Sequence, residues 1–167
     1  SKYPNVEKIK LSRAKDQTDL QAALEKIDRS FTHIKLIACL GGRLDHSLSN
    51  IYSLLGQPRR AFLETAHESI FAVDSAQPLE LSAEYLASYG ALSLFPLYGE
   101  AQNITVTQGS LGVDRIARCH LSEGLDPILL KGTNIQVACG SGLVIGVLHK
   151  QPQFKTTLSG SSPIITQ

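Results

Sequence analysis

The fold is decided by a stretch in the first third of the chain, IKLIACLGGRLDH, residues 34–46. Its first seven residues are mostly apolar and two glycines follow, a pattern typical of a buried parallel strand that feeds a turn. A helical pattern then places Leu48, Ile51, Leu54 and Leu55 on one face and stops near Gly56 and Pro58. Strand, turn and helix in this order predict a βαβ architecture.

The segments on either side of this unit extend the same pattern. Upstream, residues 20, 23, 24 and 27 form an apolar helix face, and Thr18 and Gln21 have the spacing of a capping box. This helix is expected to begin at Thr18. Downstream, residues 61–65 and 69–73 are predicted strands, the second in a hairpin. We therefore expect residues 1–76 to be part of a parallel α/β domain.

The composition changes around residues 74–81, where Ser, Gln and Pro replace the periodic apolar pattern. Short apolar stretches then alternate with Gly, Pro and Asn, which favours an all-β module. The strand candidates are residues 91–97, 104–107, 128–130, 135–139, 143–148 and 154–158. The predicted fold class is α/β plus all-β, with a β-sandwich or jelly-roll domain over residues 77–167.

The bulk composition excludes several classes of function. With 167 residues, 43% of them apolar and 19% charged, the chain can bury a core, and its net charge of +1 gives no general attraction to nucleic acid or to an anionic membrane. No apolar run approaches the ~20 residues that span a bilayer. Three cysteines without a C-x-x-C pair indicate reduced thiols and a cytoplasmic protein, and disfavour zinc.

Two acidic blocks carry the candidate chemistry, KDQTDL at residues 15–20 and GGRLDH at residues 41–46. Each stands where the chain turns into a helix. Ligands of open α/β sheets gather beyond the carboxyl ends of the strands, so two such corners can converge on one site. The residue types in these blocks predict that this site binds phosphates and Mg²⁺.

The second block has the features of an anion site. Paired glycines such as Gly41 and Gly42 let the backbone approach an anion, and the Arg43 guanidinium can bind two phosphate oxygens. Asp45 can hold Mg²⁺ or orient Arg43, and His46 and Asn50 lie one helical turn apart. The alternative is a glycine-rich turn with a surface ion pair and an ordinary histidine at a helix start. The block is not a Walker A loop.

The first block offers carboxylates and a base. Asp19 stands in the first turn of its helix and Thr18 offers a hydroxyl, while Asp16 adds a second carboxylate and Lys15 can pair with a phosphate. The alternative is that Thr18 and Asp19 only cap the helix, which is the commoner role of these residue types at this position.

Together the blocks resemble those of the thiamine pyrophosphokinase family. Residues 15–20, with Ala23 and Leu24, are similar to its K-D-x-T-D-L block, and residues 40–46, with Asn50, are similar to its G-G-R-x-D-[HQ] block. Residues 91–97, ALSLFPL, resemble the start of its carboxyl-terminal β module. The resemblance implies that residues 1–76 are the carboxyl-terminal part of a truncated Rossmann-like α/β domain, followed by a β-sandwich domain, in a homodimer whose active site lies between subunits. It also implies transfer of pyrophosphate from ATP to thiamine, with Mg²⁺, giving thiamine diphosphate and AMP.

The resemblance also implies roles for individual residues. Asp19 and Asp45 would be the carboxylates that bind Mg²⁺ or face the phosphates, and Arg43 the phosphate clamp. The residues implied in supporting contacts to ATP or thiamine are Lys15, Asp16, Thr18, Gly42, His46, Asn50 and Ser141.

Two departures from the family pattern leave alternatives open. The family has an upstream G-D-x-D-S block whose aspartates bind Mg²⁺, and this sequence begins just after its place, so the chain as given is expected to have little activity. Near its end the family has an S-N pair, where this sequence aligns Gly146 and Val147. A non-catalytic nucleotide-binding homologue and a pyrophosphokinase for another alcohol acceptor remain alternatives.

Overall fold

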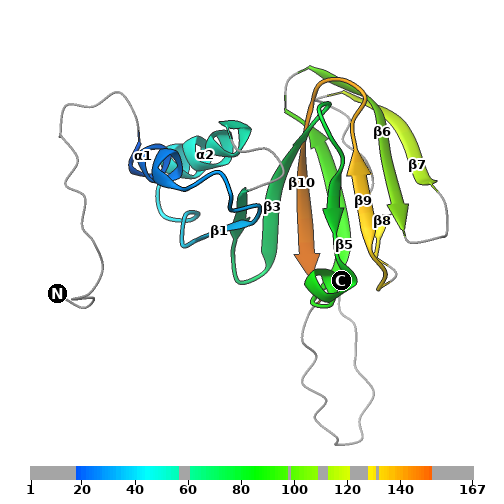
Figure 1. Ribbon diagram of the computed structural model, residues 1–167, viewed down its shortest axis with the longest axis horizontal. Helices are drawn as coiled ribbons and strands as arrows, with labels where there is room; N and C mark the ends of the chain where they lie inside the picture. Colours follow the sequence, from blue (N-terminus) through cyan, green and yellow to red (C-terminus); the bar gives the residue numbers. More distant parts are fainter. Residues whose placement is uncertain are drawn as a thin grey trace, which may run out of the picture.

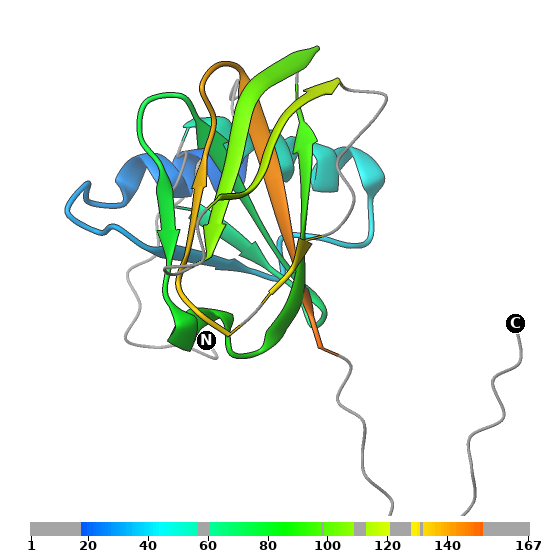
Figure 2. The same cartoon turned by 90° about the vertical axis from the view of Figure 1, so that its right-hand side faces the viewer.

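The computed structural model describes residues 18–56, 61–97, 99–108, 113–120, 128–130 and 132–151. These residues form three layers: a pair of helices, a six-stranded sheet and a four-stranded sheet (Figures 1 and 2). The expected strand at 154–158 lies outside the described residues. No helix in the described part of the chain is both long and apolar enough to cross a bilayer.

Sheet A forms the middle layer, with the helices on one side of it and sheet B on the other (Figure 1). Sheet A has the order β1 (Ile34–Ile37), β2 (Ala61–Glu64), β3 (Glu68–Asp74), β10 (Leu143–Lys150), β5 (Tyr89–Pro96), β8 (Ile128–Leu129). Sheet B has the order β4 (Leu79–Leu81), β9 (Ile135–Ala138), β6 (Glu100–Gln108), β7 (Val113–His120). A short helix, α3 (Ala83–Leu86), joins β4 to β5.

Helix α1 (Asp19–Lys26) begins where the sequence predicts. The Thr18 hydroxyl accepts the backbone N–H of Gln21 at 3.2 Å, and the Gln21 side chain accepts the Thr18 N–H at 2.9 Å. This capping box satisfies two backbone donors that a helix start leaves without partners. The buried positions are Ala22 and Leu24, so Ala22 replaces the expected Ala23 on the packed face.

Helix α2 (Leu44–Ser53) ends in a 3₁₀ turn, η1 (Leu54–Gly56). Leu54 is fully buried and Ile51 and Leu55 pack beside it, as expected. Leu48 is instead 48% exposed and lies in an exposed apolar stripe with Leu44 and Tyr52. The expectation for Leu48 was wrong because α2 contacts the sheet through its carboxyl-terminal half, and helical periodicity does not say how far a helix extends over its partner.

Strands β1 and β2 are parallel, whereas every other strand pair in the described residues is antiparallel. β1 was expected to be buried on both faces, but it is half-buried: Ile34 and Leu36 face the helices, while Lys35 and Ile37 face away and are exposed. β1 pairs on one side only in the described residues, and its outer face is open. The β2–β3 hairpin is confirmed.

Sheet A joins the two halves of the sequence, because β3 pairs with β10 and β10 pairs with β5. The structure confirms a strand-rich mixed α/β fold. The Rossmann-like and jelly-roll labels, and the division after residue 76, stay predictions. Sequence reasoning missed β4, α3 and β7, since two are very short and half of the residues of β7 are charged or polar, including the adjacent Asp114 and Arg115.

Apolar side chains fill two cores on the opposite faces of sheet A. The outer core lies between sheet A and the helices and includes Leu24, Ile34, Leu54 and Ile145. The inner core lies between the two sheets; among its members are Phe62, Phe71, Leu94, Val106, Val137 and Leu148. Burial on both faces makes sheet A the element on which the other layers pack.

Gly146 of β10 lies at a position in the inner core that has no room for a side chain. A Cβ atom at this position would lie 2.2 Å from the Phe71 ring, on the neighbouring strand and directly opposite in the register. Real Cβ atoms do not approach other atoms so closely, so Phe71 occupies the space that any side chain at residue 146 would need. A polar side chain at this position is therefore excluded by packing.

We expect Gly146→Ala to lower the free energy of unfolding by about 1–3 kcal/mol, measured by urea denaturation, because the added methyl overpacks the core. Phe71→Leu should restore part of that loss in the double variant, since leucine leaves room for the methyl. Fully additive losses in the double variant would show that Gly146 is not limited by Phe71.

Candidate functional site

The connection between β1 and α2, residues 38–43, has an unusual backbone. Ala38, Gly41 and Gly42 have φ angles of 60°, 103° and 72°. Glycine adopts positive φ without strain, which explains the pair of glycines, whereas alanine at φ 60° is costly. A strained non-glycine residue directly after a strand is an observation that points to a functional loop.

Two side chains of α2 hold this loop in place. The Asn50 amide donates to the Cys39 carbonyl at 2.6 Å. The Ser47 hydroxyl accepts the Gly41 N–H at 3.1 Å and donates to the Arg43 carbonyl at 3.2 Å. Asn50, predicted as a ligand contact, therefore positions the loop in this structure, and Ser47 is a loop-positioning residue that the sequence reasoning missed.

Arg43 and Asp45 form a two-point ion pair at the end of the loop. Arg43 Nε donates to Asp45 Oδ1 at 3.1 Å, and Arg43 Nη2 donates to Asp45 Oδ2. Their hydrogen bond raises the pKa of Arg43 and lowers that of Asp45. The side chains are 70% and 61% exposed, so a ligand can reach both. Both groups stay charged at neutral pH.

The amino ends of α1 and α2 lie at the same edge of the sheet, because the chain passes from α1 into β1 and from β1 into α2 through short connections (Figure 1). Asp19 and His46 are exposed near these helix starts, and Thr18 is the cap of α1. Lys15 and Asp16 lie outside the described residues. The convergence of Asp19 and Asp45 on one ligand stays a prediction.

No group of three or more His, Cys, Asp or Glu side chains that could hold a metal ion occurs in the part of the chain that the structure describes. Mg²⁺ commonly uses only one or two carboxylates, with waters and substrate phosphates as its other ligands. Two carboxylates such as Asp19 and Asp45 suit that kind of donor set.

Ser141 lies in the connection between β9 and β10, away from the 38–43 loop in the chain and in a different layer. Its backbone bridges Gln102 of β6, and its carbonyl accepts the Cys139 thiol at 2.9 Å. Within the described residues it shares no hydrogen bond with Gly42, Arg43 or Asp45.

A cavity of about 580 Å³ opens at the carboxyl ends of β1 and β2. It is lined by Lys35, Ile37, Ala38, Leu40, Glu64, Thr65, Ala66 and Lys150. This strand-end cavity lies where α/β sheets commonly bind ligands. Its wall includes Ala38 and Leu40, so it adjoins the loop that leads to Arg43.

Glu64 is the centre of a hydrogen-bonded network in the wall of this cavity. Its carboxylate accepts the Tyr85 hydroxyl at 2.8 Å and the Tyr89 hydroxyl at 3.1 Å, and its side chain is only 13% exposed. The Ser69 hydroxyl lies 2.9 Å from the Tyr85 oxygen. Burial is the main cause that raises the pKa of both tyrosines, so their hydroxyls remain donors at neutral pH.

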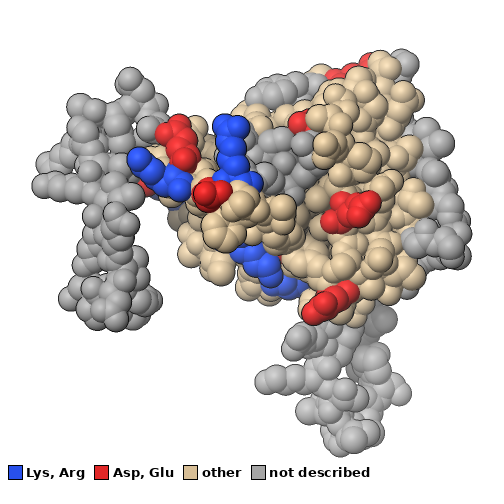
Figure 3. All heavy atoms as spheres, in the orientation of Figure 1, with Lys and Arg blue, Asp and Glu red and all other residues tan. Residues whose placement is uncertain are grey.

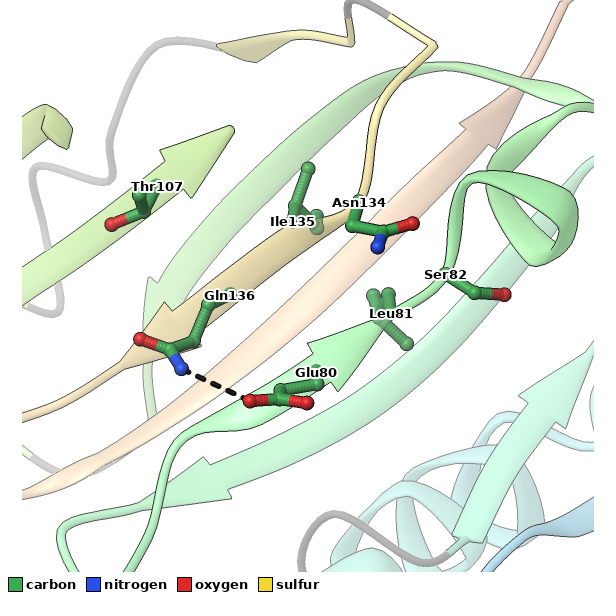
Figure 4. Close-up of a pocket in the computed structure, with 7 residues that line it drawn as sticks. All are labelled: Glu80, Leu81, Ser82, Thr107, Asn134, Ile135 and Gln136. Atoms are coloured by element: carbon green, nitrogen blue, oxygen red, sulfur yellow. Dashed lines mark hydrogen bonds between the residues drawn. The ribbon is translucent and has the colours of Figure 1, made fainter. Parts of the chain in front are cut away.

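Two further hollows follow the strand-end cavity one after the other, each sharing lining residues with the one before it. The middle hollow, about 480 Å³, shares Lys35, Glu64 and Lys150 with it and extends over Tyr85, Tyr89 and Ser82. A groove of about 570 Å³ then shares Ser82 with the middle hollow (Figure 4). This polar groove runs over β4, β9 and β6, and Gln136 Nε2 donates to Glu80 Oε1 in it at 3.2 Å.

Sequence reasoning missed Lys35, Glu64 and Lys150. Two of them had a signal: Lys35 interrupts the apolar run 34–40, and Glu64 is a charged residue near the end of the predicted strand 61–65. Lys150 had none, since only the pairing of β10 with β3 brings residue 150 to the end of β2.

The family model of the thiamin pyrophosphokinase catalytic domain matches residues 1–63. No curated protein sequence matches the chain. The family match covers both acidic blocks and ends within β2, at residue 63.

Solved structures share the fold. Thiamine pyrophosphokinase from Bacillus subtilis has a TM-score of 0.67 at 21% identity, over 83% of this chain and 66% of that one. The Geobacillus thermodenitrificans protein has a TM-score of 0.62 at 19% identity, over 83% and 64%. The Candida albicans protein has a TM-score of 0.55 at 17% identity, over 71% and 44%. The chain thus spans about two thirds of the bacterial relatives' length.

The sequence match covers both motif blocks of the catalytic domain, and the structural matches extend over both sheets of the fold. The chain is therefore similar to thiamin pyrophosphokinases in sequence over residues 1–63 and in fold over most of its length.

Proposed function

We propose that this protein transfers pyrophosphate from ATP to thiamine, giving thiamine diphosphate and AMP. The observation that carries the proposal is the position of the 38–43 loop. The loop belongs to the family-matched region, adjoins a cavity at the carboxyl ends of two parallel strands, and presents the exposed guanidinium of Arg43. An anion-binding loop at a strand end is the arrangement that nucleotide sites in α/β sheets use.

In the proposed reaction the thiamine hydroxyl attacks the β-phosphorus of ATP and AMP leaves. Arg43 would exchange its contact with Asp45 for the phosphate oxygens and stabilise the charge that develops on them. Asp45 and Asp19 would hold Mg²⁺, which neutralises phosphate charge. Asn50 and Ser47 would keep the loop in its binding conformation by the contacts that they make to its backbone.

The polar groove of Figure 4 is the proposed site for the acceptor. Thiamine carries a permanent positive charge, which the exposed Glu80 carboxylate favours. Asn134 and Gln136 offer amide groups for a heteroaromatic ring. The middle hollow connects this groove to the strand-end cavity through shared lining residues, so both substrates would lie along one surface.

A homodimer with the active site between subunits, and a cytoplasmic location, belong to the same proposal. The relatives are longer than the matched part of this chain, so the activity of the whole protein is proposed and not read from the fold.

The test is to incubate the protein with ATP, Mg²⁺ and thiamine and to measure thiamine diphosphate and AMP by chromatography. Equal amounts of both products would support the proposal. Binding of ATP without any product would favour the non-catalytic nucleotide-binding homologue. AMP formation with a different alcohol, and none with thiamine, would favour the pyrophosphokinase for another acceptor.

We expect Arg43→Lys to weaken binding of ATP with Mg²⁺ about tenfold in calorimetric titrations, because a lysine keeps the charge but loses the planar two-point contact. Thermal unfolding should not change, since the ion pair with Asp45 is exposed. Arg29→Lys, at another exposed arginine, is the control. Equal ATP affinity in the two variants would remove Arg43 from the site.

We expect Asp19→Asn and Asp45→Asn each to reduce the gain in ATP affinity that Mg²⁺ provides, because each removes a carboxylate ligand. The measurement is ATP titration with and without Mg²⁺. Glu25→Gln, which removes an exposed carboxylate farther along α1, is the control. If Asp19→Asn keeps the full Mg²⁺ dependence, Asp19 only caps its helix.

We expect Glu80→Gln to weaken thiamine binding several-fold and to reduce its dependence on salt, because the interaction of a carboxylate with a cation is screened by ions. Fluorescence titration with thiamine at two ionic strengths measures both effects. An affinity and a salt dependence equal to those of the Glu25→Gln control would place the acceptor elsewhere.

A further inference from the structure

We propose that Lys35 and Lys150 bind a phosphate group of the substrate in the strand-end cavity. This inference rests on the proposed function, which supplies a polyphosphate substrate, and it adds a pair of binding residues outside the two family motifs. Both lysines line the cavity, one from β1 and one from the end of β10. Figure 3 shows basic side chains gathered in the region where β1 and β10 lie in Figure 1.

Lys150 is held with its ammonium group at the cavity wall. Its Nζ atom donates to the Thr65 carbonyl at 2.9 Å and lies 4.0 Å from Glu64 Oε2. An ammonium group has three donors, and these contacts use one of them in a hydrogen bond. The side chain is 31% exposed. Lys150 therefore has a fixed position and free donors, which lowers the entropic cost of holding a ligand.

The Glu64 network keeps Lys150 where it is. Tyr85 and Tyr89 each donate to one oxygen of the Glu64 carboxylate, so this carboxylate cannot rotate freely. The Lys150 ammonium also lies 5.9 Å from the centre of the Tyr89 ring, a favourable distance for a cation near an aromatic ring. The network thus fixes one positive charge at the end of β2.

Lys35 supplies a second positive charge from β1, which is separated from β10 by β2 and β3 in sheet A. Its side chain is exposed on the open face of β1, and its Nζ atom lies 5.4 Å from the centre of the Tyr85 ring. Among the described residues no carboxylate forms an ion pair with it. Its charge is therefore available to a ligand.

The balance of charge selects an anion for this cavity. Lys35, Lys150 and Glu64 are the charged residues in its described lining, so one net positive charge remains. The middle hollow contains the same three residues and also Glu84, which cancels that charge. A phosphate group is therefore favoured at the strand ends, next to the loop that leads to Arg43.

The opposing interpretation is structural: Lys150 would only neutralise the half-buried Glu64, and Lys35 would be an ordinary surface lysine. The two interpretations differ in whether Lys35 affects pyrophosphate binding. An exposed side chain without an ion-pair partner should not affect stability, so a loss of binding in a Lys35 variant would not come from a damaged fold. Lys35→Gln is therefore the decisive variant, and Lys150→Gln is secondary because it leaves Glu64 without its cation.

The experiment is calorimetric titration of the protein with inorganic pyrophosphate, in the absence of Mg²⁺ and at two salt concentrations. We expect Lys35→Gln to weaken pyrophosphate binding about tenfold and to reduce its salt dependence, with the midpoint of thermal unfolding unchanged. Lys26→Gln, at an exposed lysine in the last turn of α1, is the control and should bind as the unmodified protein does.

Equal pyrophosphate affinity in Lys35→Gln and Lys26→Gln would overturn the inference, and so would an unmodified protein that does not bind pyrophosphate. These results are distinct from failure of the proposed function. Formation of thiamine diphosphate at an equal rate and ATP affinity in Lys35→Gln would leave the function in place without this site. Lysine-dependent pyrophosphate binding without any product would support the site and reject the reaction.

Discussion

The structure depends on the place of β10 at the centre of sheet A, between β3 and β5. This strand comes from the end of the described sequence, yet its register with both neighbours aligns eight residues of chain against segments about 50 to 80 residues earlier. Its side chains alternate between the outer core and the inner core. The close approach of Phe71 to Gly146 fixes that register, because a shift by one residue would place a side chain where the ring lies.

The same strand completes the candidate site. Where β10 ends, Lys150 reaches the backbone of Thr65 and the Glu64 carboxylate, which stand at the end of β2. The parallel partner of β2, β1, then leads into the loop with Ala38 and the paired glycines. Charged groups from three strands thereby meet at one edge of the sheet. Parallel strands make this possible, since their carboxyl ends lie together.

The arrangement of Arg43 and Asp45 explains why the sequence motif alone could not show whether Arg43 binds a ligand or only Asp45. The sequence left two alternatives, a phosphate clamp and a surface ion pair, and the structure contains the ion pair in an exposed position. An exposed pair contributes little to stability and can be exchanged for a ligand at small cost. The ion pair is thus compatible with a clamp that acts only when phosphate is present.

Patterns among neighbouring residues were sufficient to predict the helix cap, the hairpin and the turn of this protein. The sequence by itself determined the capping box of Thr18 and Gln21, the β2–β3 hairpin and the turn at Gly41 and Gly42, because each depends on residues a few positions apart. Only the tertiary structure decided the open face of β1, the exposure of Leu48, and the meeting of Lys35, Glu64 and Lys150. These features depend on which strand lies beside which, and periodicity along the chain carries no information about that.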